Sequence, residues 1–203
     1  MKPFLSIVIP VCDEGKNLPL ALIDIDRRLS SVDYSYEVVV VDGNPSDAKT
    51  KTIEKFKKFF PYLRSEKILA GGKKGPVVKT GMLSARGSYR LFVDVEMQLP
   101  LGWFAEAIPL FKGGAEAVLD SRNRFWCFGE EAAERIFRAV SVAGEGIGFE
   151  AATLAHLMGL NVAAFSVQDA VLEGPRPKFS ARLSAARDII TVRLNVLLHR
   201  YTW

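Results

Sequence analysis

The sequence predicts an α/β, Rossmann-like fold in which helices flank a mainly parallel sheet. Short apolar runs rich in Val and Ile, such as residues 4–11 and 36–41, are typical of buried parallel strands. Amphipathic segments, such as residues 18–29, alternate with these runs, as they do in folds built from β-α-β units. The chain has 203 residues, of which 49% are hydrophobic, and this is enough for one globular domain spanning residues 1–203.

The individual elements follow from these two patterns, taken in order along the chain. Continuous apolar runs bounded by polar or turn residues predict strands at residues 4–11, 36–41, 68–69, 89–93, 115–119 and 161–167. Apolar residues at helical spacing predict helices at residues 18–29, 50–59, 77–85, 101–111, 130–140 and 149–158. Ser46 or Asp47 can cap the second helix. Residues 181–203 are expected to form a C-terminal amphipathic helix, since apolar residues from Leu183 to Leu197 recur near a 3.6-residue period.

The composition excludes several classes of protein. The net charge of +4 suits an anionic partner, but the chain has no dense stripe of Lys and Arg with interleaved aromatics, so no nucleic-acid partner is expected. Cys12 and Cys127 form neither a metal-binding spacing nor a disulfide framework, which favours a reduced, cytoplasmic setting. We find no signal peptide and no apolar window near the roughly 20 residues of a spanning helix.

Acidic residues stand where three of the predicted strands end. The strand of residues 89–93 stops at Asp94-Val95-Glu96, followed by Gln98, and Asp13-Glu14 and Asp42 follow two other strands. The carboxyl ends of parallel strands share one edge of the sheet, where open α/β sheets bind ligands. Carboxylate pairs suit Mg²⁺ or Mn²⁺ that also binds a diphosphate. For any single acid, the alternative is a loop carboxylate or a helix cap.

Two cationic loops are candidates for anion binding. The loop of residues 71–76 contains Lys73 and Lys74, either of which could meet a nucleotide or a phosphate; the alternative is an ordinary surface turn. It lacks G-x-x-x-x-G-K-[ST], which excludes a P-loop, and no G-x-G-x-x-G follows the first strand. Arg176 and Lys178 lie in a proline-restricted loop that would present cations to an anion, unless that loop is a solvated turn.

Several segments, in order along nearly the whole chain, resemble family 2 glycosyltransferases with the GT-A fold. Residues 6–14 (SIVIPVCDE) resemble the family opening SIVIPVYNE, and residues 38–47 (VVVVDGNPSD) resemble VVVDDGSxD or VVDGNSTD. Residues 75–100 are similar to GKGxAxxxGxxxAxGxxxxFxDADLQxPP, and residues 115–122 (AEAVLDSR) to ADVVIGSR. Within the family, the resemblance is to the dolichyl-phosphate mannose and glucose synthases, which transfer sugar to a polyprenyl phosphate.

The resemblance implies a role for each matched residue. The nucleotide of a UDP- or GDP-hexose donor would contact Asp13, Glu14 and Asp42, together with Pro10 and Asn44 of the matched segments and Lys74 of the basic loop just before the third segment. Asp94 and Glu96 would hold Mn²⁺ or Mg²⁺, and Asp94 and Gln98 would be the catalytic pair, with Gln98 positioning a phosphate. Arg122, Arg176 and Lys178 would neutralise phosphates. The expected activity is metal-dependent, inverting hexosyl transfer, most readily to dolichyl or polyprenyl phosphate.

The chain also departs from the family pattern in ways that keep alternatives open. The usual Asp-x-Asp is Asp94-Val95-Glu96, the paired acids after the second strand are Asp42-Gly43, and the FDxE motif is reduced to Phe149-Glu150. A long segment that family members carry after GSR is missing beyond Arg122. The alternatives are a nucleotide-binding protein without turnover and a transferase with a saccharide acceptor. The tail helix either packs on the domain or lies peripherally on the cytosolic face of a membrane.

Overall fold

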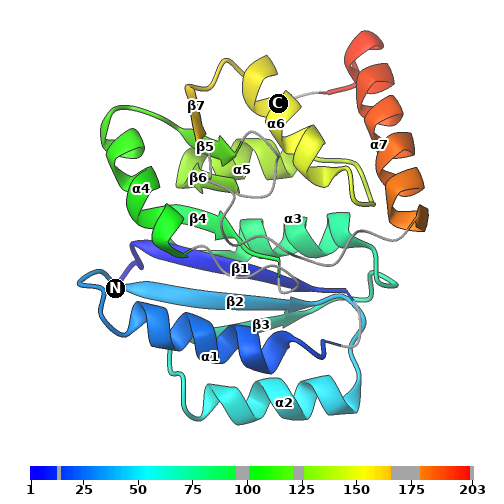
Figure 1. Cartoon of the computed structure of the whole chain (residues 1–203). Coiled ribbons are helices and arrows are strands. Elements are labelled where there is room, and N and C mark those ends of the chain that lie inside the picture. The colour runs from blue at the N-terminus through cyan, green and yellow to red at the C-terminus, as the bar shows by residue number, and fades with distance from the viewer. Residues whose placement is uncertain (13–14, 95–100, 121–125, 166–178, 202–203) are drawn as a thin grey trace.

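The computed structural model describes residues 1–12, 15–94, 101–120, 126–165 and 179–201 (Figure 1). Within these ranges, the strands form one seven-stranded sheet with the order β3-β2-β1-β4-β6-β5-β7. The strands are β1 (Leu5–Val11), β2 (Tyr36–Asp42), β3 (Leu63–Lys67), β4 (Tyr89–Phe92), β5 (Ala117–Asp120), β6 (Trp126–Gly129) and β7 (Val162–Phe165). β6 is antiparallel to both β4 and β5, and the other pairings are parallel. The mainly parallel α/β fold is therefore confirmed.

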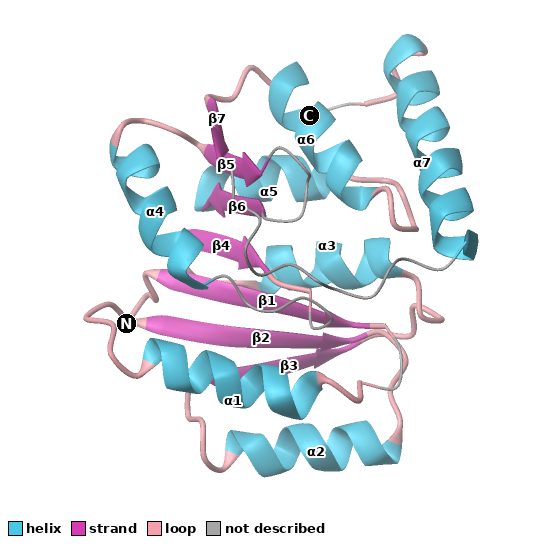
Figure 2. Ribbon diagram, in the orientation of Figure 1, coloured by secondary structure: helices cyan, strands magenta, loops and turns pink. Residues whose placement is uncertain are grey.

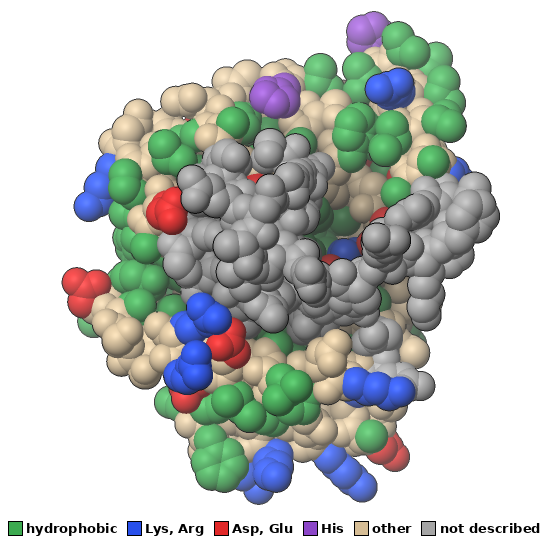
Figure 3. All heavy atoms as spheres, in the orientation of Figure 1, with side chains coloured by type: hydrophobic (Ala, Val, Ile, Leu, Met, Phe, Trp, Pro, Cys, Tyr) green, Lys and Arg blue, Asp and Glu red, His purple; other side chains and the backbone are tan. Residues whose placement is uncertain are grey.

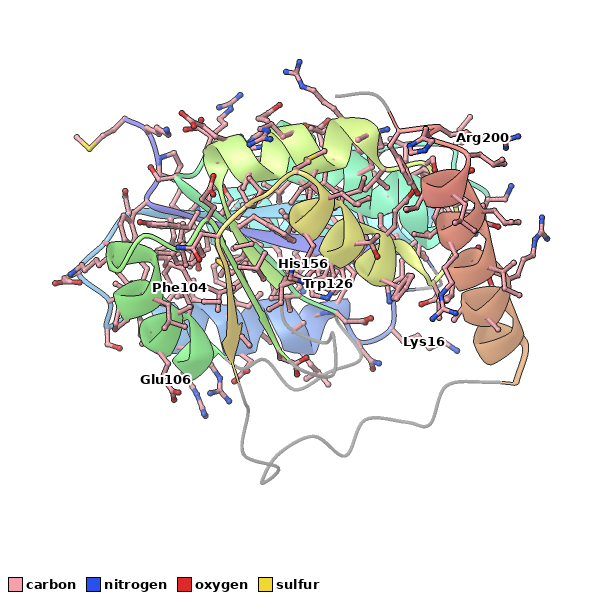
Figure 4. The ribbon with its side chains drawn as sticks, turned by 90° about the horizontal axis from the view of Figure 1, so that it is seen from above. Lys16, Phe104, Glu106, Trp126, His156 and Arg200 are labelled. Carbon is pink, nitrogen blue, oxygen red and sulfur yellow. The ribbon has the colours of Figure 1, made fainter. Side chains whose placement is uncertain are left out.

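Helices cover both faces of the sheet, and Figure 2 shows the sheet between the two helical layers. They are α1 (Leu18–Leu29), α2 (Asp47–Lys57), α3 (Lys74–Ser84), α4 (Leu101–Lys112), α5 (Glu130–Ala139), α6 (Ile147–Leu157) and α7 (Phe179–Leu197). Side chains alternate along a strand, so Ile7 and Ile9 of β1 pack with α1 and α4, whereas Val8 packs with α3, α5 and α6. Seen from above, α1 and α5 lie on opposite sides of the sheet (Figure 4).

Because β6 alone runs against the others, the remaining described strands all end at the same edge of the sheet. In Figure 1, the arrows of β1, β2 and β4 point toward the side of the molecule on which α7 lies. Along the part of the chain that is described, no helix has the length and the apolar character needed to cross a membrane. The predicted site residues that the structure describes lie at or near this carboxyl edge.

Pro10 is accommodated inside the central strand β1 because of where the pairing with β4 ends. The β1–β4 ladder stops at Val8 and Phe92, and the last bond runs from the Val93 amide to the Val8 carbonyl. Backbone groups alternate sides along a strand, so the Pro10 nitrogen, which has no hydrogen to donate, faces the β4 side beyond this last bond. Pro10 is buried and paired with Val41 of β2 on its other side.

Two of the predicted elements need correction, and one strand was not predicted. The third strand is Leu63–Lys67 rather than residues 68–69: Leu63 supplies its buried residue, whereas Leu69 is almost fully exposed. The short antiparallel strand β6 was not predicted, because it passes directly into α5 with no turn residues between them. Finally, α3 begins at Lys74, so Lys74 and Gly75 belong to a helix rather than to the preceding loop.

Buried Glu37 of β2 makes the stability of the fold sensitive to acid. It accepts hydrogen bonds from Ser6 Oγ (2.7 Å), Arg64 Nη1 (2.8 Å) and the Arg86 amide (2.6 Å). Burial raises the pKa of the carboxyl, but the hydrogen bonds, led by that from Arg64, outweigh burial and hold the pKa below its ordinary value of 4.5. The stability that Glu37 contributes is therefore complete above that value and is lost as the pH falls through the folded pKa.

We expect Glu37→Gln to lower the free energy of unfolding at neutral pH and to lower it progressively less as the pH falls through the folded pKa, where the wild-type carboxyl becomes protonated as well. Urea unfolding at a series of pH values measures this difference. Glu106→Gln, at an exposed position of α4, is the control and should show little change at any pH. An equal loss at all pH values for Glu37→Gln would contradict the prediction.

Candidate functional site

Among the residues that the structure describes, three carboxylates follow or end strands at the carboxyl edge of the sheet. Asp42 is the last residue of β2, Asp120 is the last residue of β5, and Asp94 follows β4 by two residues. Asp42 and Asp120 are buried, whereas the side chain of Asp94 is 23% exposed. The sequence analysis placed Asp42 and Asp94 at this edge, and the structure confirms that position for both.

Asp42 is held rigidly at the end of β2. Its side chain is fully buried, and its Oδ1 accepts from Lys49 Nζ at 2.7 Å and from the Asn44 amide at 3.2 Å. Asn44 itself is exposed in the turn. The other carboxylate oxygen, Oδ2, is buried without a hydrogen-bond partner among the described residues. A buried acceptor without a donor costs about 1–3 kcal/mol, so Oδ2 is an atom that a bound ligand could satisfy.

Lys49, which the sequence analysis did not single out, is the cation that makes a buried Asp42 tolerable. It lies in the first turn of α2, and its side chain is 5% exposed. Its aliphatic stem passes close to Gly15, where an added Cβ would lie 3.1 Å from Lys49 Cδ. Gly15 has a φ of +66°, a conformation that favours glycine. Lys49 thus joins the ends of β1 and β2 to α2.

Packing explains why glycine follows Asp42 in place of a second acid. A Cβ added to Gly43 would lie 2.3 Å from Cγ2 of Val77, a buried residue of α3. Valine is β-branched and has little rotamer freedom in a helix, so it cannot turn away at low cost. The close approach of the β2 turn to α3 therefore requires glycine at position 43.

Lys74 connects the first residues of α3 to Asp94. Its Nζ lies 2.8 Å from Asp94 Oδ2 and 3.1 Å from Glu145 Oε2, and 5.7 Å from the centre of the Phe92 ring. Burial by itself lowers the pKa of Lys74, but the carboxylates of Asp94 and Glu145 outweigh burial and raise it, so the ammonium stays charged. The sequence analysis proposed an anion-binding role for Lys73 or Lys74, and the structure brings Lys74 against Asp94.

Two aromatic side chains, from β4 and β6, pack next to Lys74. The Phe92 ring at the end of β4 stacks on Trp126 of β6, with the ring centres 4.2 Å apart. Trp126, labelled in Figure 4, is buried. The ammonium of Lys74 therefore lies between carboxylates and an apolar surface, where charge interactions are stronger than in water.

The donor set at this edge fits a hard divalent cation in part. Asp94 supplies a carboxylate, the ligand type that Mg²⁺ and Mn²⁺ prefer, and it is accessible enough to reach a bound ion. In the described ranges, no three His, Cys, Asp or Glu side chains are grouped as a metal site. A metal held here would therefore complete its shell with ligands beyond this set, such as diphosphate oxygens or water.

The remaining predicted site residues lie outside the residues that the structure describes. They are Asp13, Glu14, Glu96, Gln98, Arg122, Arg176 and Lys178. Glu145 was missed by the sequence analysis, and nothing near it in the sequence points to Lys74, which is 71 positions away. Contacts across such a separation follow from the tertiary fold.

Comparison with known proteins identifies the family to which the chain belongs. Residues 6–140, which run from the second residue of β1 through α5 and contain every described site residue except Glu145, match the model of glycosyl transferase family 2. The chain belongs to glycosyl transferase family 2. As a family 2 glycosyltransferase it is an enzyme, and the resemblance found in the sequence is confirmed at the level of the family.

Two relatives illustrate how the similarity is distributed. This family 2 glycosyltransferase is 23% identical to a dolichyl-phosphate beta-glucosyltransferase of Dictyostelium discoideum, over 96% of this chain and 75% of the relative. It is 34% identical to the dolichyl-phosphate beta-glucosyltransferase of Saccharomyces cerevisiae, over 46% of this chain and 30% of the relative.

Solved structures show the same GT-A fold. A mannosyltransferase from Pyrobaculum calidifontis in complex with GDP-Man and Mn²⁺ superposes with a TM-score of 0.73 at 18% identity, covering 97% of this chain and 65% of that chain. The glucosyl-3-phosphoglycerate synthase from Mycobacterium tuberculosis in complex with Mn²⁺, UDP and glucosyl-3-phosphoglycerate superposes with a TM-score of 0.70 at 15% identity, covering 95% and 79%. The GT-A fold predicted from the sequence is confirmed.

Proposed function

We propose that this glycosyltransferase moves a hexose from a UDP- or GDP-sugar to a polyprenyl phosphate such as dolichyl phosphate, with inversion and with Mn²⁺ or Mg²⁺. The observation that carries the proposal is the pairing of Lys74 with Asp94 at the carboxyl edge. The pairing supports the proposal, because a cation that would contact phosphate oxygens lies beside a carboxylate that would bind a metal. Both groups are needed to stabilise a departing nucleoside diphosphate.

The choice of acceptor rests on chemistry and on the relatives. A phosphate monoester is anionic near neutral pH, so it can attack the anomeric carbon without a dedicated base. Direct displacement by that oxygen inverts the anomeric configuration. The relatives named above are dolichyl-phosphate glucosyltransferases, which supports a lipid phosphate acceptor.

Each predicted residue has a place in this proposal. Asp94 and Glu96 would hold the metal, which neutralises charge on the leaving diphosphate, and Gln98 would position a phosphate. Lys74 and the three cations of the later loops, Arg122, Arg176 and Lys178, would neutralise the remaining phosphate charge. The nucleotide would lie over Pro10, Asp13, Glu14 and Asn44, with Asp42 Oδ2 as an acceptor for one of its donors.

The proposal is tested by a transfer screen that pairs UDP- and GDP-hexoses with Mn²⁺ or Mg²⁺, with and without a short polyprenyl phosphate. We expect metal-dependent formation of the polyprenyl-phosphate hexose from one donor class. Transfer to a saccharide instead would overturn the acceptor. Nucleotide binding with no turnover under any pairing would overturn the transferase role and favour the binding-protein alternative.

Lys74 should matter for turnover more than its neighbour Lys73. We expect Lys74→Gln to lower kcat/KM by about 10- to 100-fold, because a charge-assisted contact to phosphate is lost. Lys73→Gln is a matched control, since Lys73 is an adjacent, exposed lysine at the N-cap of α3. Steady-state kinetics of both variants decides the prediction, and equal losses would contradict it.

We also propose that the outer face of α7 contacts the membrane that holds a lipid acceptor. Four leucine or isoleucine side chains, in the second half of this helix and directly after it, are 50% or more exposed: Ile190, Leu194, Leu197 and Leu198. Figure 3 shows this apolar surface at the upper right, with a cationic side chain among the apolar ones. Exposed Arg187, Arg193 and Arg200 complement anionic lipid headgroups.

Flotation with vesicles containing anionic phospholipid tests the membrane contact. Leu194→Gln with Leu197→Gln should weaken vesicle binding by on the order of tenfold, from the apolar area that no longer leaves water. Leu20→Gln with Ile23→Gln is the matched control, because these apolar residues are similarly exposed on α1. Equal binding by the α7 variant and the wild type would contradict the proposal.

A further inference from the structure

The loop that joins α5 to α6, residues 140–146, is attached to α3 at three points. The Val140 carbonyl accepts from Lys79 Nζ at 2.8 Å, the Ala143 carbonyl accepts from the Gly75 amide at 3.0 Å, and Glu145 accepts from Lys74 Nζ at 3.1 Å. The contact at Gly75 is tight, because an added Cβ would lie 2.1 Å from the Val142 carbonyl oxygen. The position of this α5–α6 loop therefore sets the position of the first turn of α3.

Glu150, in the first turn of α6, holds one part of the α5–α6 loop. Its fully buried carboxylate accepts from the Val142 amide (2.8 Å), the Ser141 amide (3.1 Å), Ser141 Oγ (2.7 Å) and Tyr201 Oη (2.7 Å). A buried carboxylate is costly unless such donors surround it. Burial and the Glu150 carboxylate raise the pKa of Tyr201 to about 12, so Tyr201 remains a donor.

Asp188 of α7 holds the other end of the α5–α6 loop. Its Oδ2 accepts from the Gly146 amide at 3.0 Å. The two loop glycines make room for it, because a Cβ on Gly144 would lie 2.3 Å from Asp188 Oδ2, and one on Gly146 would lie 2.3 Å from Asp188 Cβ. Residues 141, 142 and 146 thus donate hydrogen bonds to carboxylates, whereas residues 140, 143 and 145 accept hydrogen bonds from α3.

We infer that Glu150 and Asp188 are positioning residues for the donor site: they fix the α5–α6 loop, and the loop places the Lys74 ammonium beside Asp94. The inference rests on the proposed function only for what Lys74 then binds. The hydrogen bonds described for Glu150 and Asp188 do not include one with Lys74, so their effect on the site passes through Glu145 and Gly75. The contribution of α7 also links the C-terminal segment to the chemistry.

The placement of Lys74 can be measured without any substrate. Mass spectrometry after limited acetylation gives the labelling rate of each lysine, and the rate of Lys57, on the distant α2, serves as an internal reference. In the wild type, Lys74 should label slowly because it is largely buried and paired twice. We expect Glu150→Gln and Asp188→Asn each to raise the relative labelling rate of Lys74 by about fivefold, the scale of one lost hydrogen bond.

Hydrogen exchange reports on the α5–α6 loop in the same variants. The amides of Val142 and Gly146 should exchange faster in Glu150→Gln and Asp188→Asn, respectively. Tyr201→Phe removes one donor to Glu150 and keeps the inference testable if Glu150→Gln does not fold; it should raise Lys74 labelling about twofold. The matched control is Glu134→Gln, which removes a carboxylate of α5 that pairs with Arg90 and Arg138 instead.

The outcomes separate positioning from general loosening and from the proposed function. Unchanged Lys74 labelling in folded Glu150→Gln, Asp188→Asn and Tyr201→Phe would overturn the inference. An equal increase in Glu134→Gln would also overturn it, since it would show loss of stability alone. Faster Lys74 labelling in Glu150→Gln, Asp188→Asn and Tyr201→Phe but not in Glu134→Gln would support the inference. Absence of nucleotide binding by the wild type would overturn the proposed function and leave the inference standing.

Discussion

Replacing Asp94 by asparagine is expected to lower kcat/KM by about 10³-fold, the scale of a lost electrostatic stabiliser of the leaving group. Asparagine keeps the shape of the side chain but removes the negative charge that a divalent cation needs. It also leaves Lys74 paired with Glu145, so the fold around α3 should remain intact. The proposed metal role predicts a second effect: calorimetry should show Mn²⁺ strengthening UDP or GDP binding in the wild type and not in Asp94→Asn.

Asp47→Asn is the matched control for Asp94→Asn. Asp47 is an exposed carboxylate in the first turn of α2, just beyond the carboxyl end of β2, so its removal changes the net charge equally. It should leave both kcat/KM and the Mn²⁺ effect within about twofold, because a screened surface charge contributes little. Nucleotide binding by the wild type that is equally tight with and without Mn²⁺ would rule out the metal role of Asp94.

The parts of the fold that the sequence predicted well are those in which local pattern and tertiary environment agree. β1 and β2 are buried on both faces, so their continuous Val and Ile runs mark them clearly. β3 misled the prediction because it is an edge strand with one buried residue, Leu63, and because the more apolar Ile68-Leu69 follows it. Pairing with β2 decides the position of β3, and the sequence of β3 contains no hydrophobic pattern that would predict this pairing.

The residues of the candidate site likewise fall into those that the sequence could predict and those that it could not. Strand ends can be located from sequence, and topology brings parallel ends together, so Asp42 and Asp94 could be placed on one edge before any coordinates were known. The charged residues that pair with these site residues could not be predicted from the sequence. Lys49 resembles any lysine in the first turn of a polar helix, and Glu145 resembles any acidic residue of a loop. Each owes its role to pairing with a charged side chain on another element: Lys49 is buried against Asp42, and the exposed Glu145 pairs with Lys74.

The buried pair of Asp42 and Lys49 leads to the second large expected effect. Lys49→Met should lower the free energy of unfolding by about 3–5 kcal/mol, because the Asp42 carboxylate is then left buried without its cation. Methionine fills nearly the same volume, so the loss reflects charge rather than a cavity. Guanidinium chloride unfolding measures it, and Lys51→Met, at an exposed position of the same helix, should change stability by less than about 0.5 kcal/mol.

The double variant Asp42→Asn with Lys49→Met distinguishes the structural role of Asp42 from its role in nucleotide binding. Removing both charges should recover much of the stability lost in Lys49→Met, because no uncompensated charge remains in the interior. Nucleotide binding should not recover, since the amide offers one acceptor oxygen in place of the carboxylate's two. Recovery of stability together with binding would show that Asp42 serves only to anchor α2. Recovery of stability alone would show that the same carboxylate stabilises the edge of the sheet and contacts the nucleotide.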